Sequence, residues 1–385
     1  MLAHGSGVLA TDRPPIPDRF PGARLWEIQL PAVPAQPPVF DDRHAYVALR
    51  DGTLVALSLA NGSTVWSVAR PVSLPLAQSA GVLLVVHESV AWGVDGLTGQ
   101  TKWERDVGAP GALAPTATGD LGVVLTAERE VVVLNLRNGS IVRRSTLRAP
   151  PTVVPVFAND RLFVALPDGE IQAFDSRSGG LIWTRRLAAS ATSLNVVDDQ
   201  LYVGATDKFL YALDTARGGV RWKWRTGGGI TAATAADTRR TYVVSLDSSL
   251  RALGRQHGDL KWQTRLSSRP QSGPVIDLDY VVVPGVAPEL RAYKALDGSP
   301  AGVELLSGRP IHVPHFIPLA GGVLDHLVVV TSSGQVVALS RAVEPPVVPL
   351  DPIPGTIQAP ETANLVCIDY MPGTLLPRET RPVIR

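Results

Sequence analysis

Two segments decide the fold of the chain, AFDSRSGGLIW at residues 173–183 and ALDTARGGVRW at residues 212–222. Each ends in tryptophan, with a glycine four positions earlier. Glycine and tryptophan recur at this spacing in Gly22/Trp26, Gly62/Trp66, Gly99/Trp103 and Gly258/Trp262, whereas Gly139/Arg143 and Gly298/Gly302 keep only the glycine. The eight anchors are about 39 residues apart, the length of a four-stranded propeller blade. The repeat therefore predicts eight blades.

Paired short runs rich in valine, leucine and tyrosine precede the anchors, with a polar turn between the two runs. Examples are LFVALPDGEIQAF at residues 162–174 and LYVGATDKFLYALD at residues 201–214. Runs of this length and composition, bounded by Asp, Gly, Ser or Pro, are typical of a strand, a turn and a second strand. No amphipathic helical stretch exceeds two turns. The sequence therefore predicts an all-β fold, an eight-bladed β-propeller of four-stranded antiparallel blades.

The two ends of the repeat region complement each other. The last paired run, residues 327–340, is followed by RAVEPPVVPLDPIP, whose prolines cannot donate to a β-ladder. PGARLWEIQL at residues 21–30 has the pattern of an outer strand with no paired run before it. We expect this N-terminal strand to complete the last blade, since an open ring would leave exposed sheet edges.

The resulting division is an N-terminal extension at residues 1–20, a propeller at residues 21–341 and a proline-rich tail at residues 342–385. The proline density of the tail predicts extended or disordered chain. Its apolar stretch LVCIDYMPGTLL, residues 365–376, could pack on the propeller or be captured by a partner.

Composition excludes several classes of protein. Thirty-six Lys and Arg against 35 Asp and Glu leave a net charge of +1, which gives no electrostatic reason to expect a nucleic-acid partner. No apolar run approaches the ~18 residues of a membrane span, and the first residues lack the pattern of a secretion signal. The single cysteine, Cys367, excludes an intrachain disulfide and zinc sites that need two thiolates.

The segments at residues 173–183, 212–222 and 93–103 resemble the tryptophan-docking motif of quinoprotein-type propellers. The resemblance covers about residues 21–340 and includes two branches. One comprises quinone-dependent dehydrogenases, for which it implies calcium-bound pyrroloquinoline quinone, a catalytic aspartate and commonly a vicinal disulfide. The other is the non-enzymatic lipoprotein branch of outer-membrane β-barrel assembly, to which the chain is more similar in size and in the regularity of its repeats.

The tryptophans are expected to dock one blade on the next. The glycine suits a turn of positive φ before the outer strand, and the indole ring then lies against the neighbouring blade. A small residue ten positions before the anchor leaves room for the ring, as at Ala56, Gly93, Ala173, Ala212, Ala252 and Ala292. The predicted structural docking residues are Trp26, Trp66, Trp103, Trp183, Trp222 and Trp262.

Strand direction predicts a candidate binding face. In an up-and-down blade, the turn between the second and third strands lies on the same face as the connection to the next blade. Acids occur in seven of these turns, at Asp51, Glu88, Glu128, Asp168, Asp207, Asp247 and Glu289, where an Asp often bonds its own turn. The proline-rich connections supply the predicted partner-binding residues Arg70, Arg148, Arg269 and Arg309. These connections could equally be ordinary solvated loops.

No catalytic, cofactor-binding or metal-binding residues are predicted. The catalytic aspartate and calcium ligands of the dehydrogenases cannot be placed on any segment, and one cysteine cannot form their vicinal disulfide. His312 and His315 are close in sequence, but Pro314 and the lack of adjacent acids favour loop histidines over a metal site.

The favoured hypothesis is a non-enzymatic scaffold that binds protein partners, in a bacterial cell-envelope or periplasmic complex that could be membrane-associated. It has no membrane span of its own and no cofactor. The alternatives are a quinone-dependent oxidoreductase and a sensor or accessory subunit of a larger membrane complex.

Overall fold

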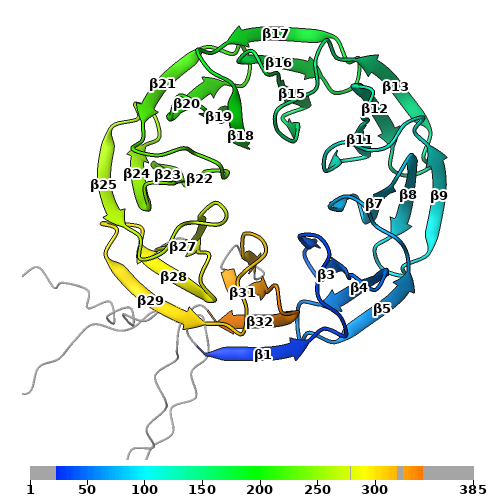
Figure 1. Ribbon diagram of the computed structural model, residues 1–385, viewed down its shortest axis with the longest axis horizontal. Helices are drawn as coiled ribbons and strands as arrows, with labels where there is room; N and C mark the ends of the chain where they lie inside the picture. The colour runs from blue at the N-terminus through cyan, green and yellow to red at the C-terminus, as the bar shows by residue number, and fades with distance from the viewer. Residues whose placement is uncertain (1–22, 278, 319–323, 341–385) are drawn as a thin grey trace, which may run out of the picture. The chain divides into compact units, whose positions relative to one another are not determined.

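The computed structural model describes residues 23–277, 279–318 and 324–340. Within these ranges the regular structure is entirely β, with thirty-two strands in eight four-stranded sheets (Figure 1). The all-β, eight-bladed prediction is confirmed. The expected extension at residues 1–20 and the expected tail at residues 342–385 lie outside the described residues.

In each blade the four strands are hydrogen-bonded neighbours, ordered from the inner to the outer edge of the ring. Blades 1 to 4 are formed by β2 (Val39–Phe40), β3 (His44–Ala48), β4 (Thr53–Ser58) and β5 (Thr64–Ala69); β6 (Ala77–Ser79), β7 (Val82–His87), β8 (Val90–Asp95) and β9 (Thr101–Asp106); β10 (Thr116–Thr118), β11 (Leu121–Leu125), β12 (Glu130–Asn135) and β13 (Ile141–Thr146); and β14 (Val156–Ala158), β15 (Arg161–Ala165), β16 (Glu170–Asp175) and β17 (Leu181–Arg186). Blades 5 to 8 are formed by β18 (Ala191–Val197), β19 (Gln200–Ala205), β20 (Phe209–Asp214) and β21 (Val220–Arg225); β22 (Ala235–Ala236), β23 (Arg240–Ser245), β24 (Ser249–Gly254) and β25 (Leu260–Arg265); β26 (Val275–Asp277), β27 (Tyr280–Pro284), β28 (Glu289–Lys294) and β29 (Pro300–Leu305); and β30 (His315–Pro318), β31 (Leu324–Val330), β32 (Gln335–Ser340) and β1 (Arg24–Gln29).

The eighth blade closes the ring with the N-terminal strand, as predicted. β1 pairs antiparallel with β32, and its register places Trp26 opposite Ala338. Two backbone hydrogen bonds extend the pairing at its ends, from Leu30 N–H to the Gly334 carbonyl (2.8 Å) and from Ser340 N–H to the Ala23 carbonyl (2.9 Å). Figure 1 shows β1 as the outer strand beside β32. Residues far apart in the sequence thus complete one sheet.

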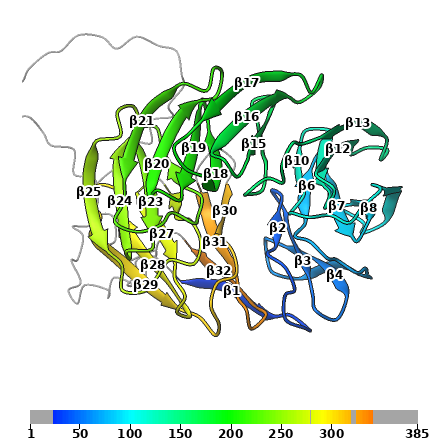
Figure 2. The same cartoon turned by 45° about the horizontal axis from the view of Figure 1, so that its top comes forward.

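Among the residues that the structure describes, the core consists of eight hydrophobic clusters, and each lies between two adjacent blades. Successive side chains of a strand point to opposite faces, so one blade contributes to the clusters on both of its sides. For this reason the inner strands read as almost continuous apolar runs; β3 is buried along its whole length, whereas β5 alternates exposed and half-buried positions. Figure 2 shows β2, β6 and β10 in succession along the inner side, where neighbouring inner strands contact each other.

In the described part of the chain, no helix has the length and apolar character needed to cross a membrane.

Candidate partner-binding face

The tight turns between second and third strands lie on the same face as the connections between blades. Several acids in these turns accept hydrogen bonds from backbone N–H groups two residues later, as Asp51 does from Thr53 (2.9 Å) and Asp207 from Phe209 (3.0 Å). Such bonds fix the turn. They give these acids a local structural role and leave the arginines as the main recognition candidates on this face.

Arg148 is engaged in an ion-pair network with blade 4. Its Nη2 lies 2.6 Å from Asp168 Oδ2 and 3.0 Å from Glu170 Oε2, and Arg186 contacts the same two carboxylates. The hydrogen bond from Arg148 lowers the pKa of Asp168. Because two arginines face two acids here, the charge of Arg148 is largely balanced within the ring.

Arg70 is held against blade 2. Its guanidinium lies 5.1 Å from the ring centroid of Trp92 on β8, and Nη2 donates to Thr101 Oγ1 on β9 (2.5 Å). A cation over an aromatic face, with one hydrogen bond to the same blade, is suited to fixing blade 1 on blade 2. Arg70 therefore has a role inside the propeller.

Arg269 and Arg309 differ from these two residues. Both are exposed, and among the described residues no hydrogen bond or ion pair involves either guanidinium. Their backbones are nevertheless fixed, because the Arg269 carbonyl accepts from Val286 N–H (3.0 Å) and the Arg309 carbonyl accepts from Ser332 N–H (2.8 Å). They occupy successive connections, between β25 and β26 and between β29 and β30.

An exposed apolar residue adjoins Arg269. Val286, in the turn between β27 and β28, is 51% exposed and is hydrogen-bonded through its backbone to Arg269. The sequence analysis considered the acidic residues of these turns and therefore did not identify Val286. The sequence does contain the relevant feature, which is a valine in a turn where the other blades have mostly polar residues. We call Arg269, Val286 and Arg309 the arginine patch.

The six tryptophans lie between blades. Trp183 pairs across strands with Ala173, and its Nε1 donates to the Thr215 carbonyl of the next blade (2.9 Å). Gly218 (φ +67°) passes so close that a Cβ there would lie 2.6 Å from the Trp183 ring. The equivalent indole groups bond backbone carbonyls of the next blade at Trp66, Trp103, Trp222 and Trp262, while Trp26 packs in the cluster between blades 8 and 1.

The histidine pair belongs to the wall between blades 8 and 1. The ring of His315 stacks on Phe40 at 4.4 Å, and Val330 N–H donates to His312 Nε2 (3.3 Å). Burial lowers the pKa of His312 to about 4. No cluster of three or more His, Cys, Asp or Glu that could hold a metal occurs among the residues that the structure describes.

Solved structures share this fold. BamB from Moraxella catarrhalis superposes with a TM-score of 0.67 at 17% identity, covering 83% of this chain and 97% of that one. The quinohemoprotein alcohol dehydrogenase from Comamonas testosteroni superposes with a TM-score of 0.64 at 12% identity, covering 84% of this chain and 77% of that one. At these identities the likeness shows the fold alone.

Curated relatives match part of the chain. An outer membrane protein assembly factor BamB from Legionella pneumophila (strain Paris) is 28% identical over 134 residues, and one from Nitrosomonas eutropha (strain DSM 101675 / C91 / Nm57) is 27% identical over 171 residues. The matches cover 34% and 41% of this chain, and 35% and 41% of the respective relatives. The protein family described as "Outer membrane protein assembly factor BamB" matches over residues 8–166 and 167–311. Because these ranges include most of the repeats, the chain belongs to this family of quinoprotein-like propellers.

Proposed function

We propose that the chain is a non-enzymatic scaffold that binds a protein partner in a bacterial cell-envelope complex, in a role related to outer membrane protein assembly. Family membership and the names of the curated relatives support this role. The observation that carries it is the arginine patch, in which Arg269 and Arg309 are exposed on fixed backbone and have no partner among the described residues.

The chemistry of the patch suits a protein surface. Arginine is favoured at the centre of interfaces because its planar fork binds carboxylates through two hydrogen bonds. Val286 adds apolar surface beside it. The partner is therefore expected to present acidic side chains next to an apolar residue. The rigid blades position both arginines for this contact.

The test is charge reversal, Arg269→Glu with Arg309→Glu. Mild cross-linking in native membranes, with mass spectrometry of the attached proteins, first identifies the partner of the wild-type chain. Recovery of that partner is then compared between wild type and variant, and the variant is expected to lose most of it.

The matched control is Arg177→Glu with Arg217→Glu. Both residues are exposed in turns between third and fourth strands, on the opposite face, so the change in net charge is the same. Partner recovery that is unchanged in the arginine-patch variant, or reduced equally in the control, would remove the patch from the proposal.

A quinone-dependent oxidoreductase is the second candidate, favoured by the fold likeness to the quinohemoprotein alcohol dehydrogenase. Titration of the pure protein with pyrroloquinoline quinone and calcium distinguishes the two. Saturable binding of the quinone, together with electron transfer to a dye, would favour the oxidoreductase and contradict the scaffold proposal.

A further inference from the structure

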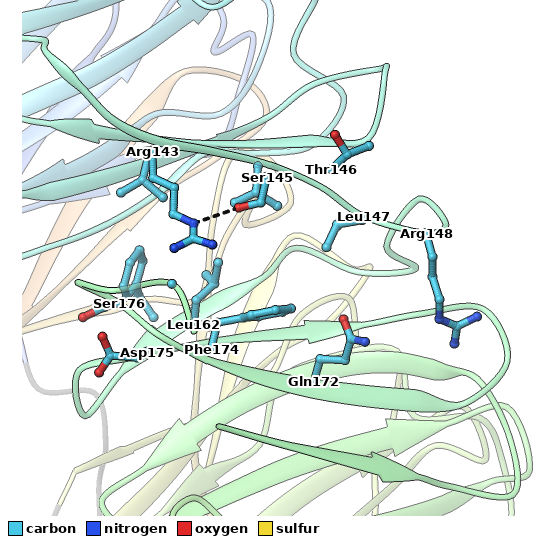
Figure 3. Close-up of a pocket in the computed structure, with 14 residues that line it drawn as sticks. Arg143, Ser145, Thr146, Leu147, Arg148, Leu162, Gln172, Phe174, Asp175 and Ser176 are labelled. Atoms are coloured by element: carbon cyan, nitrogen blue, oxygen red, sulfur yellow. Dashed lines mark hydrogen bonds between the residues drawn. The ribbon is translucent and has the colours of Figure 1, made fainter. Parts of the chain in front are cut away.

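The interface between blades 3 and 4 lacks the tryptophan that six other interfaces possess. Arg143 on β13 occupies the anchor position, and no tryptophan belongs to the cluster between these blades. A cavity of about 270 Å³ remains there (Figure 3). We call it the blade 3–4 slot.

The cross-strand row that ends at Arg143 explains the slot. In blade 5 the row runs Tyr202, Ala212, Trp222, so two aromatic rings fill the space across a small residue. In blade 3 the corresponding row is Val123, Val133 and Arg143. This row has no aromatic ring. The Arg143 guanidinium lies against Gly179, as the Trp183 ring lies against Gly218, but it does not fill the remaining space between the blades.

The floor of the slot is apolar and partly aromatic. Buried Val131, Val133, Leu147 and Leu162 line it, together with the half-buried rings of Phe157 and Phe174 from blade 4. Arg143 points into the same space, where its Nε donates to Ser145 Oγ (3.3 Å; Figure 3). Its Nη1 donates to the Ser178 carbonyl. Phenyl rings and a guanidinium plane together favour an aromatic occupant over an aliphatic one.

The slot also retains the hydrogen-bond acceptor for an indole. In five interfaces the indole Nε1 donates to the carbonyl of the residue directly after the third strand of the next blade, for example from Trp103 to Leu136 (2.6 Å). Ser176 occupies this position after β16 and lines the cavity. Within the described residues, no hydrogen bond ends on the Ser176 carbonyl.

We propose that the blade 3–4 slot binds the indole side chain of a tryptophan presented by an extended segment of a protein partner. A volume of about 270 Å³ is at the small end of ligand cavities, which suits one ring system and not a large cofactor. The lining runs from the turn at Gly179 to the connection at Arg148, along the height of the blade wall. The inference rests on the proposed scaffold function.

The experiment uses the whole protein and a short peptide, acetyl-Gly-Ser-Trp-Ser-Gly-amide, labelled as 5-fluorotryptophan. Fluorine NMR follows its binding without interference from the eight tryptophans of the chain. Saturable binding of this peptide is expected for the wild-type protein. A second peptide, in which a fluorinated phenylalanine replaces the tryptophan, should bind more weakly. Free 5-fluoroindole forms a second arm; if it binds and the peptide does not, the assignment to a protein partner is overturned.

The variant designed to fill the slot is Val133→Ala with Arg143→Trp. It introduces the small residue and the tryptophan that the other interfaces between blades contain. It is expected to fold with a raised melting temperature and to bind the peptide at least about tenfold more weakly. Val142→Trp is the matched control, because it adds a tryptophan at a 47% exposed position on the same strand, outside the lining of the slot, and should keep binding. Equal affinity of the double variant and wild type, or no binding to wild type, would overturn the proposal. The assay contains no partner protein, so its result does not depend on the test of the arginine patch.

Discussion

Trp183 shows how one side chain fixes two blades. It is 8% exposed, lies 5.8 Å from Phe163 and donates to the Thr215 carbonyl. We predict that Trp183→Ala lowers the free energy of unfolding by about 3–5 kcal/mol, the range for deletion of a large core ring. Urea denaturation measures this. Leu181→Ala, on the same strand but at a 56% exposed side chain, should change stability by less than about 0.5 kcal/mol.

His312 makes the free energy of unfolding of the propeller decrease in mild acid. Its folded pKa of about 4 lies below the ordinary value of 6.5, so between these pH values the unfolded chain binds more protons. Stability is therefore lost as pH falls through this window. The loss attributable to His312 between pH 7 and pH 5 is about 2 kcal/mol.

His312→Gln should remove that part of the pH dependence, as measured by urea denaturation at pH 7 and pH 5. The exposed His257 provides the control, since His257→Gln should leave the dependence as it is in wild type. Equal dependence in His312→Gln and wild type would show that His312 is not the group responsible.

At the scale of the element, β1 closes the ring through its backbone. Leu30 N–H donates to the Gly334 carbonyl, directly before β32. Donors alternate along a strand, so Ile28 N–H faces β32 whereas Gln29 N–H faces away. We predict that Ile28→Pro lowers the free energy of unfolding by about 1–3 kcal/mol more than Gln29→Pro, because it leaves a β32 carbonyl without its donor. Urea denaturation of both variants checks this, with Ile28→Ala to subtract the side chain. Equal effects would mean that β1 contributes little to closure.

At the scale of the whole molecule, the ring was predictable from the sequence, whereas the surroundings of the arginines on the proposed binding face were not. The spacing of Gly and Trp revealed the number of blades, and the unmatched strand at residues 21–30 revealed the closure. The alternating direction of the strands predicted that one face carries Arg70, Arg148, Arg269 and Arg309. It does not predict which side chains of the next blade contact them. Arg148 meets Asp168 from the next blade and Arg70 meets Trp92, and these contacts depend on how adjacent blades pack.

The sequence by itself determined the repeat, the β-architecture and the closing strand, because each follows from a local pattern that recurs along the chain. Only the tertiary structure decided which arginines are exposed and that the substitution of tryptophan by Arg143 leaves a cavity. Both depend on groups that the next blade brings close, such as the Asp168 side chain at Arg148 and the Ser178 carbonyl at Arg143, which are 20 and 35 residues away in the sequence. Blade packing is a property of neighbouring repeats, and no single repeat encodes it.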